Sequence, residues 1–112
     1  MAASIEHEDR DGVRWILVDG ELDYVDADEA GDAILAALDV GVDGAADHAA
    51  QRVVLDLSAV GFLGSAGIRI LIQSWKRVSE RGGEFSVTGM SATAQRVFTT
   101  TGLDGIIPQL DE

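Results

Sequence analysis

Residues 56–67 read DLSAVGFLGSAG, and this stretch decides how the rest of the chain is arranged. It follows the apolar run Val53-Val54-Leu55, which is typical of a central strand covered on both faces. A glycine-rich connector runs from Gly61 to Gly67, and a helix is predicted from about Ser65 to Arg81. The apolar residues of that helix recur on a single stripe at helical spacing: Ile68, Leu71, Ile72, Trp75 and Val78. The centre of the chain is therefore predicted to be a strand, a connector and a helix.

Weaker signals on either side extend this alternation of strands and helices. An opening hairpin is predicted from residues 4–9 and 13–18, with a turn at Arg10-Asp11-Gly12. The other predicted elements are a helix at Tyr24–Leu38, a loop at Gly41–Ala50, a strand around Phe85–Val87, a helix capped by Ser91 and a short strand at Ile106–Ile107. Strands that alternate with helices favour right-handed crossovers and a mostly parallel sheet. We predict one α/β domain over residues 1–112, with a mixed sheet of four or five strands and three main helices.

The chain is strongly acidic, and the acidic residues are unevenly distributed. Its 112 residues include 20 Asp and Glu against 8 Lys and Arg, which gives a net charge of −12. Residues 1–50 hold 14 of the acids and 2 of the bases, whereas residues 51–112 hold 6 of each. Such a charge opposes binding to nucleic acid or to anionic membranes, because both require basic groups on the protein. Part of the acidic surface is predicted to steer a partner that carries a basic patch.

Other functional classes are disfavoured by what the sequence lacks. It contains no cysteine, no apolar run near the ~20 residues that a membrane span needs, and no secretory signal among its polar first residues. These features lead us to expect a cytoplasmic protein. His7 and His48 are isolated, Lys76 is the single lysine, and no glycine-rich phosphate-binding motif occurs. We therefore predict no metal site, no cofactor and no nucleotide chemistry.

Ser65 is the attractive candidate for chemistry, since it stands between Gly64 and Gly67 at a strand-to-helix connection. A hydrolase elbow needs glycine two places on either side of the serine, and Leu63 breaks that pattern. Two other roles stay open. The hydroxyl could cap the helix by accepting a hydrogen bond from an early backbone N–H. It could instead carry a phosphate, which the N–H groups and the positive end of the helix would stabilise.

The same stretch resembles the signature of the STAS domain, a family found in bacterial anti-sigma-factor antagonists. The family pattern D-L-S-x-V-x-F-[ILM]-D-S-[SA]-G is fitted by Asp56, Leu57, Ser58, Val60, Phe62, Leu63, Ser65 and Gly67. The resemblance extends to Gly20-Glu21-Leu22-Asp23 and to the stretch from Gly83 to Leu103, so nearly the whole chain takes part. Two positions depart from the family: Gly64 stands where an acidic residue is usual, and Ala66 where a second serine is often found.

The resemblance implies a regulatory binding protein rather than an enzyme. In this family the unphosphorylated protein binds an anti-sigma factor, which is often also a serine kinase, and so frees a sigma factor for transcription, including in stress responses. Phosphorylation of the motif serine, here Ser65, weakens the complex, and a phosphatase reverses the modification. The departure at Gly64 keeps an alternative open, in which the chain is a STAS scaffold or transporter-associated subunit that phosphorylation does not regulate.

The resemblance and the expected strand ends indicate a partner-binding surface around the connector. We expect this surface to gather at one rim of the sheet and to comprise Asp23, Asp56, Ser58, Gly64, Ser65, Ala66 and Gly67. Two of these residues also have plainer roles open to them: Asp23 could cap the first helix, and Asp56 could hold the connector through backbone bonds. Trp15 and Trp75 lie in apolar patterns and are predicted to be core residues.

Overall fold

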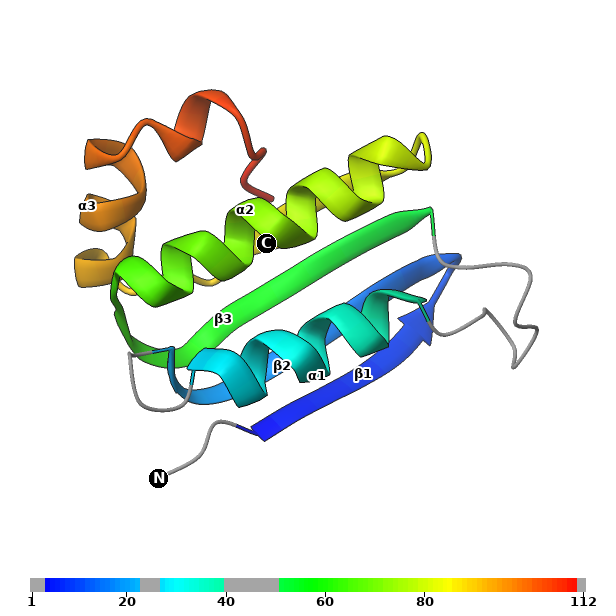
Figure 1. Cartoon of the computed structure of the whole chain (residues 1–112), viewed down its shortest axis with the longest axis horizontal. Coiled ribbons are helices and arrows are strands. Elements are labelled where there is room, and N and C mark those ends of the chain that lie inside the picture. The colour runs from blue at the N-terminus through cyan, green and yellow to red at the C-terminus, as the bar shows by residue number, and fades with distance from the viewer. Residues whose placement is uncertain (1–3, 23–26, 40–50, 111–112) are drawn as a thin grey trace.

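The fold was obtained as a computed structural model, which describes residues 4–22, 27–39 and 51–110. Its elements in chain order are β1 (Ser4–Arg10), β2 (Val13–Leu22), α1 (Ala27–Asp39), β3 (Arg52–Leu63), α2 (Ser65–Glu80), β4 (Glu84–Thr88), α3 (Ala92–Thr100) and the 3-10 helix η2 (Leu103–Gly105). The strands form one sheet in the order β1-β2-β3-β4, and α1 and α2 pack side by side across one face of it (Figure 1). The predicted α/β architecture with three main helices is confirmed. The predicted loop at Gly41–Ala50, with His48, and Asp23 lie outside the described residues.

The opening hairpin forms because its turn residues can adopt a left-handed backbone. Asp11 and Gly12 have φ angles of 53° and 80°, the combination that a two-residue hairpin turn of this kind requires. β1 then pairs antiparallel with β2 over its full length, whereas β2 with β3 and β3 with β4 pair in parallel. Parallel neighbours need a crossover, and helices α1 and α2 supply the two that are required here. The sheet is therefore mixed, as predicted.

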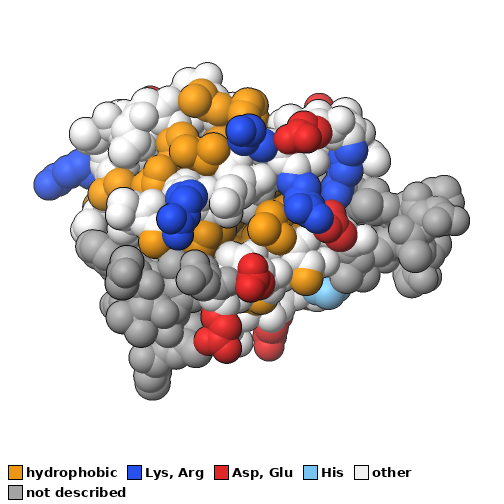
Figure 2. Space-filling view, in the orientation of Figure 1, with side chains coloured by type: hydrophobic (Ala, Val, Ile, Leu, Met, Phe, Trp, Pro, Cys, Tyr) orange, Lys and Arg blue, Asp and Glu red, His pale blue; other side chains and the backbone are white. Residues whose placement is uncertain are grey.

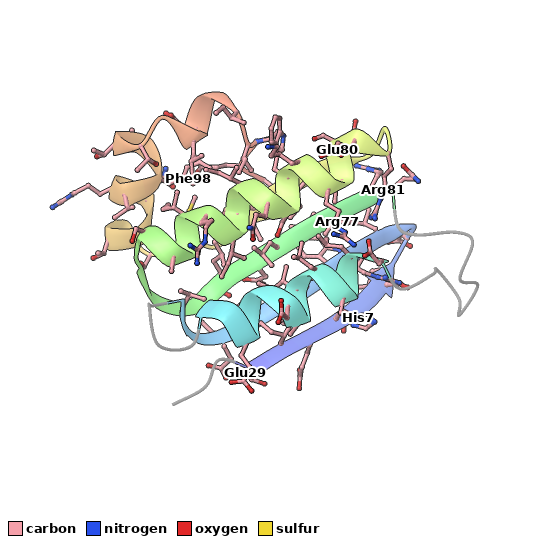
Figure 3. The ribbon with its side chains drawn as sticks, in the orientation of Figure 1. His7, Glu29, Arg77, Glu80, Arg81 and Phe98 are labelled. Atoms are coloured by element: carbon pink, nitrogen blue, oxygen red, sulfur yellow. The ribbon has the colours of Figure 1, made fainter. Side chains whose placement is uncertain are left out.

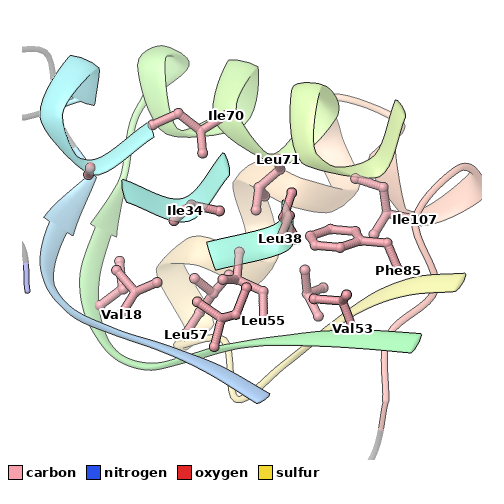
Figure 4. Packing of buried hydrophobic residues seen from close by; sticks show 14 of the residues in the cluster. Val18, Ile34, Leu38, Val53, Leu55, Leu57, Ile70, Leu71, Phe85 and Ile107 are labelled. Atoms are coloured by element: carbon pink, nitrogen blue, oxygen red, sulfur yellow. The ribbon is translucent and has the colours of Figure 1, made fainter. Parts of the chain in front are cut away.

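The hydrophobic core lies between one face of the sheet and the helices (Figure 4). It is a single cluster of buried side chains that includes Ile16, Val18, Ile34, Leu38, Val53, Leu55, Leu57, Ile70, Leu71, Phe85, Phe98 and Ile107. Successive residues of a strand face opposite sides of the sheet, so Leu55 and Leu57 enter this cluster whereas Asp56 and Ser58 face away from it. Leu17 is exposed on that second face, which we call the open face of the sheet.

The end of the chain departs from the prediction, because no strand forms at Ile106–Ile107. Leu103–Gly105 form η2, and Ile107 donates its N–H to the carbonyl of Leu103 (N···O 2.8 Å). Pro108 then follows without an N–H to give. The chain reaches the sheet only at Gln109, through an isolated parallel bridge to Val87 of β4. The sheet of the described residues therefore has four strands.

The buried face of α2 is rotated relative to the predicted one. The buried residues of this helix are Gly67, Ile70, Leu71, Ser74 and Val78. Ile72 belongs to the predicted apolar stripe, but it is 36% exposed. At 3.6 residues per turn, Ile72 lies roughly 200° around the helix from Ser74. Ser74 is buried and donates its hydroxyl to the carbonyl of Ile70 (2.8 Å). Hydropathy could not identify this face, because glycine and serine on it contribute no hydrophobic signal.

The two tryptophans occupy different surroundings. Trp75 is half-buried and packs against the core, as predicted. Trp15 faces the other way, because its neighbour Ile16 takes the core side of β2. On the open face Trp15 lies beside Val54 of β3, and the guanidinium of Arg10 sits 4.5 Å from the centre of its ring. The prediction that Trp15 is a core residue is therefore wrong.

Two arginines from outside α1 complete the end of that helix, whose last turn contains no basic residue. Arg14 is buried in β2 and donates to the carbonyl of Ala37 (2.8 Å). The same side chain donates to both carboxylate oxygens of Asp9 (2.7 and 2.9 Å). Arg81 donates to the carbonyl of Leu38 (2.9 Å). These bonds satisfy carbonyl groups that a helix end leaves without intrahelical donors.

Asp39, the last residue of α1, ties α1 to α2. Its carboxylate accepts two hydrogen bonds from Arg77, one of them at 3.1 Å, and a longer one from Arg81 at 3.3 Å. The hydrogen bond from Arg77 is the main cause that holds the pKa of Asp39 below its ordinary value of 3.8, against desolvation, which raises it. Figure 3 shows Arg77 and Arg81 together at the end of α2, away from the point where this helix begins.

Candidate functional site

Ser65 stands at the junction where β3 ends and α2 begins. Gly64 takes the N-cap position with an extended backbone (φ −91°, ψ −175°), and no side chain caps the helix there. Ser65 is the first helical residue and is exposed. The prediction that Ser65 caps α2 is therefore wrong, because the cap lies one residue earlier in the chain. Within the described ranges the Ser65 hydroxyl has no hydrogen-bond partner, so it faces solvent.

Burial increases along the first three residues of α2. Gly67 is buried, Ala66 is half-buried and Ser65 is exposed. The N–H groups at a helix start have no intrahelical acceptor, and here the bond from Ile68 N–H to the carbonyl of Gly64 (3.0 Å) opens the helical series. This first turn contains no acidic residue. A phosphate on Ser65 would thus meet the positive end of the helix and no carboxylate of the first turn.

Asp56 and Ser58 form a second group, within β3 and on the open face. One oxygen of the Asp56 carboxylate accepts hydrogen bonds from the Ser58 N–H (2.9 Å) and from the Ser58 hydroxyl (2.5 Å). Gly89, which follows β4, approaches both residues closely with φ +74°. A Cβ at Gly89 would lie 2.9 Å from Ser58 Cβ and 3.0 Å from the Asp56 carboxylate. Asp56 therefore makes the local backbone bond that its plainer predicted role requires.

The structure does not gather Asp56 and Ser58 at the start of α2. The connector was predicted to begin at Gly61, but the strand continues to Leu63 because its backbone stays paired with β2. At ~3.3 Å per residue, Asp56 and Leu63 are separated by about 23 Å along the strand. The predicted surface thus divides into a group at the helix start, Gly64–Gly67, and a group along the sheet. Asp23 lies outside the described residues.

A shallow hollow of about 180 Å³ opens beside Asp56 on the open face. It is lined by Ser4, Glu6, Leu17, Val18, Asp19, Asp56, Ser58 and Ala59. Sequence reasoning missed this hollow and the close approach of Gly89, because both depend on which strands become neighbours. The available signal was the glycine directly after the strand Glu84–Thr88, where a close backbone contact or a turn is common. The described residues contain no group of three or more His, Asp and Glu that could hold a metal ion.

The described residues contain one histidine, His7, that could be considered as a base for Ser65. Figure 3 shows His7 on β1, toward the end of the molecule where Arg77 and Arg81 lie, whereas α2 begins at the other end. No described histidine is therefore in reach to act as a base for Ser65. None of the described helices is both long and apolar enough to cross a lipid bilayer.

The two long helices carry charges of opposite sign. The charged side chains described on α1 are all acidic: Glu29, Asp32 and Asp39. Those of α2 are mostly basic: Arg69, Lys76 and Arg77, against Glu80. Figure 2 shows Lys and Arg side chains spread over the upper helix, with Asp and Glu more frequent toward the lower edge. The division between an acidic and a neutral half of the sequence thus becomes a division between neighbouring helices.

Comparisons with known proteins agree with this fold. Residues 4–112 match the STAS domain. An anti-sigma F factor antagonist of Paenibacillus polymyxa is 26% identical over 111 residues, which cover 99% of this chain and 89% of that protein. The anti-sigma-F factor antagonist RsfB of Mycobacterium tuberculosis is 30% identical over 96 residues, which cover 86% of this chain and 71% of that protein.

Solved structures show the same relationship. The crystal structure of an anti-sigma factor antagonist from Mycobacterium paratuberculosis has a TM-score of 0.81 and 34% identity, over 99% of this chain and 87% of that one. The phosphorylated form of SpoIIAA, a Bacillus cell fate determinant, shares the fold at 18% identity, with a TM-score of 0.66 over 97% of this chain and 93% of that one. From its matched residues and its fold, the chain belongs to the STAS-domain family.

Proposed function

We propose that this chain is an anti-sigma-factor antagonist, a regulatory binding protein that captures an anti-sigma factor and so releases a sigma factor for transcription. The observation that carries the proposal is Ser65, exposed at an uncapped helix start in a chain whose relatives are named for this activity. The chain acts by binding, without a cofactor, and Gly64–Gly67 form the centre of the contact. Asp56 and Ser58 support that centre by holding β3 in shape.

Phosphorylation of Ser65 by the anti-sigma factor, acting as a serine kinase, switches the binding off, and a phosphatase restores it. The supporting chemistry is electrostatic. A phosphate adds about −1.5 to −2 charges, and a buried charge without a partner costs several kcal/mol. Since ~1.4 kcal/mol changes affinity tenfold, two or three kcal/mol suffice to separate the partners. SpoIIAA, which shares this fold, has been solved in a phosphorylated form.

Gly64 bears on how a kinase recognises this chain. The resemblance puts an acidic residue at this position in other members, and the glycine removes one carboxylate next to the acceptor. A phosphate on Ser65 then meets less local repulsion, because the first turn of α2 has no acidic residue either. A kinase that acts on this chain therefore recognises the acceptor without a carboxylate at position 64.

The test is to incubate the protein with its cognate anti-sigma factor and Mg-ATP and to map the product by mass spectrometry. One phosphate is expected on Ser65, and none on the Ser65→Ala variant. Binding should survive in Ser65→Ala and fall at least tenfold in Ser65→Glu. Ser79→Glu adds the same charge to an exposed serine near the end of the same helix and serves as the control.

Two results would contradict the switch. The first is an unmodified Ser65 after incubation with a partner whose kinase activity has been verified on another substrate. The second is equal binding by Ser65→Ala and Ser65→Glu, which would favour a scaffold or a transporter-associated subunit that phosphorylation does not regulate.

A further inference from the structure

The open face of the sheet, which is turned away from α1 and α2 in Figure 1, carries three acidic residues around one apolar residue. Glu6 of β1 pairs with Leu17 of β2, and Leu17 pairs with Asp56 of β3, so the three stand in a row across the strands. Neighbouring strands lie ~4.8 Å apart, which puts an acidic residue about that far from Leu17 on each side. Asp19 follows Leu17 by two places on β2, and all four residues line the hollow beside Asp56. Acidic residues therefore enclose Leu17 on three sides.

Leu17 is the apolar centre of this group, and it is 40% exposed. Between Leu17 and Asp19 the pairing of β2 with β3 shifts by one residue, as it does at a β-bulge. The residues of β3 at the shift, Ser58 and Ala59, are both small and exposed. The hollow next to them measures about 180 Å³, against the ~30 Å³ that one water molecule occupies in the liquid. It therefore has room for a side chain that packs on Leu17.

The charges of the open face do not balance at this hollow. The two arginines of the face are already paired, Arg10 with Glu8 (2.7 Å) and Arg52 with Glu84 (3.5 Å). The lining of the hollow contains three carboxylates and no lysine or arginine. Within the described residues none of these carboxylates has an ion pair, and one oxygen of Asp56 bonds only to Ser58. The unbalanced charge of the open face is therefore negative and lies around the hollow.

This charge restricts what can cover the hollow. Nucleic acid and anionic lipid surfaces carry negative charge and are repelled. A second copy that docked by the same face would bring the same three carboxylates against the first three, which is also unfavourable. A basic protein segment has the opposite charge, and an apolar side chain within it can cover Leu17. Such a segment matches the usual anatomy of a protein contact, in which an apolar centre is surrounded by polar groups.

We infer that the open face is a second docking surface, which binds a basic segment of a partner protein through Glu6, Leu17, Asp19 and Asp56. An apolar side chain of the segment enters the hollow and packs on Leu17, and its lysines or arginines meet the surrounding carboxylates. The inference goes beyond the proposed function, because this surface lies on the open face and contains no residue of Gly64–Gly67. It also assigns the steering of a basic patch, which the net charge predicts, to a particular part of the molecule.

The experiment titrates the ¹⁵N-labelled protein with a capped five-residue peptide, four lysines around a central leucine, at about 20 mM NaCl, where screening is weak. Amide shift changes should concentrate on β1, β2 and β3 around Leu17. The double variant Glu6→Gln/Asp19→Asn should bind the peptide about fivefold more weakly, and Leu17→Ser about threefold more weakly. Glu29→Gln/Asp32→Asn is the matched control, because it removes the same charge from exposed residues of α1, and its affinity should stay within about twofold of wild type.

A second peptide, with serine in place of the leucine, tests the apolar contact from the side of the ligand and should bind about threefold more weakly. It also replaces Leu17→Ser if circular dichroism shows that this variant does not fold.

Several results would overturn the inference. One is an equal loss of affinity in the α1 control, or shift changes centred on α1, since either would mean general attraction to an acidic chain. Another is binding of spermidine, a cation without an apolar side chain, as tightly as the leucine peptide. A third is the absence of shift changes up to about 10 mM peptide. Sedimentation adds a fourth, because a loss of self-association in Leu17→Ser would make the open face a contact between copies. All these measurements leave Ser65 unchanged, so their failure does not affect the proposed function.

Discussion

Replacing Arg14 by methionine tests whether a buried arginine joins the opening hairpin to α1. The Arg14 side chain is 1% exposed, and it donates to the two carboxylate oxygens of Asp9 and to the carbonyl of Ala37. Methionine is unbranched and flexible, so it fills most of the vacated volume. The substitution therefore removes the polar contacts while it leaves only a small cavity.

The expected loss of stability depends on whether each acceptor can bind water once the guanidinium of Arg14 is removed. Asp9 is 30% exposed, so its carboxylate regains water and the loss of its two bonds costs about 1 kcal/mol. The bond to the Ala37 carbonyl is buried, and an acceptor left there without a donor costs about 1–3 kcal/mol. The sum is about 3 kcal/mol, out of roughly 5–15 kcal/mol for a whole domain. For a chain of this size it lowers Tm by roughly 13 °C.

Urea denaturation followed by circular dichroism measures this loss. Arg52→Met is the control, because Arg52 is 65% exposed and contacts Glu84 at 3.5 Å across the surface. Such a pair contributes about 0–1 kcal/mol. Asp9→Asn should fall between the two variants, since it weakens only the solvated part of the Arg14 contacts. A loss in Arg14→Met no larger than that in Arg52→Met would refute the reasoning, because burial would then make no difference to the arginine.

Further substitutions, each of which changes a single contact or cap, can be measured by the same urea denaturation. Gly83→Ala would bring a Cβ within 2.6 Å of a backbone carbonyl oxygen and should cost about 2–3 kcal/mol of stability. Gly82→Ala, at φ +78° in open space, should cost about 1 kcal/mol. Equal losses of stability in the two variants would disprove the steric argument. Ser91→Ala removes the bond to the third N–H of α3 and should cost ~1 kcal/mol, which Ser91→Asp should largely avoid. The pKa of Asp39 is lower in the folded state, so its contribution to stability is full above about pH 4 and is lost as pH falls through the lowered pKa. Asp39→Asn should therefore make the free energy of unfolding depend less steeply on pH in acid. An unchanged dependence on pH would contradict this role of Asp39. Gly64→Asp gives α2 a side-chain cap and should raise the free energy of unfolding by about 0.5 kcal/mol. A decrease in that free energy would contradict the assignment of Gly64 to the cap position.

Much of the fold was predictable because local signals and the final packing agree. The turn at Asp11-Gly12 needs a left-handed backbone, and the residues on either side pair as a hairpin. Ser91 was predicted to cap a helix, and its hydroxyl oxygen accepts a hydrogen bond from the N–H of Ala94 (3.2 Å). Each of these features depends on residues close in sequence, which is why a sequence pattern is enough to predict them.

The site was less predictable because it depends on pairing between distant segments. Gly61 indicated a loop, yet the chain from Ala59 to Leu63 remains a strand because β2 runs beside it and takes its backbone bonds. Serine is a usual capping residue, and Ser65 was therefore expected to cap α2. Ser65 is instead the first helical residue, so the cap position falls one residue earlier, on Gly64. The exposure of Ile72 has the same kind of cause, since it depends on which face of α2 meets the sheet.

The position of Ser65 one residue after the cap has a consequence for the proposed switch. A serine at the N-cap would use its hydroxyl to hold the helix, and a phosphate there would disturb a bond of the fold. Ser65 holds no such bond within the described residues, and Gly64 provides no neighbouring carboxylate. The electrostatic effect of a phosphate is therefore directed at whatever covers the start of α2 rather than at the helix itself. A chain built in this way can lose its partner on phosphorylation while its own fold is unchanged, which is what a reversible antagonist requires.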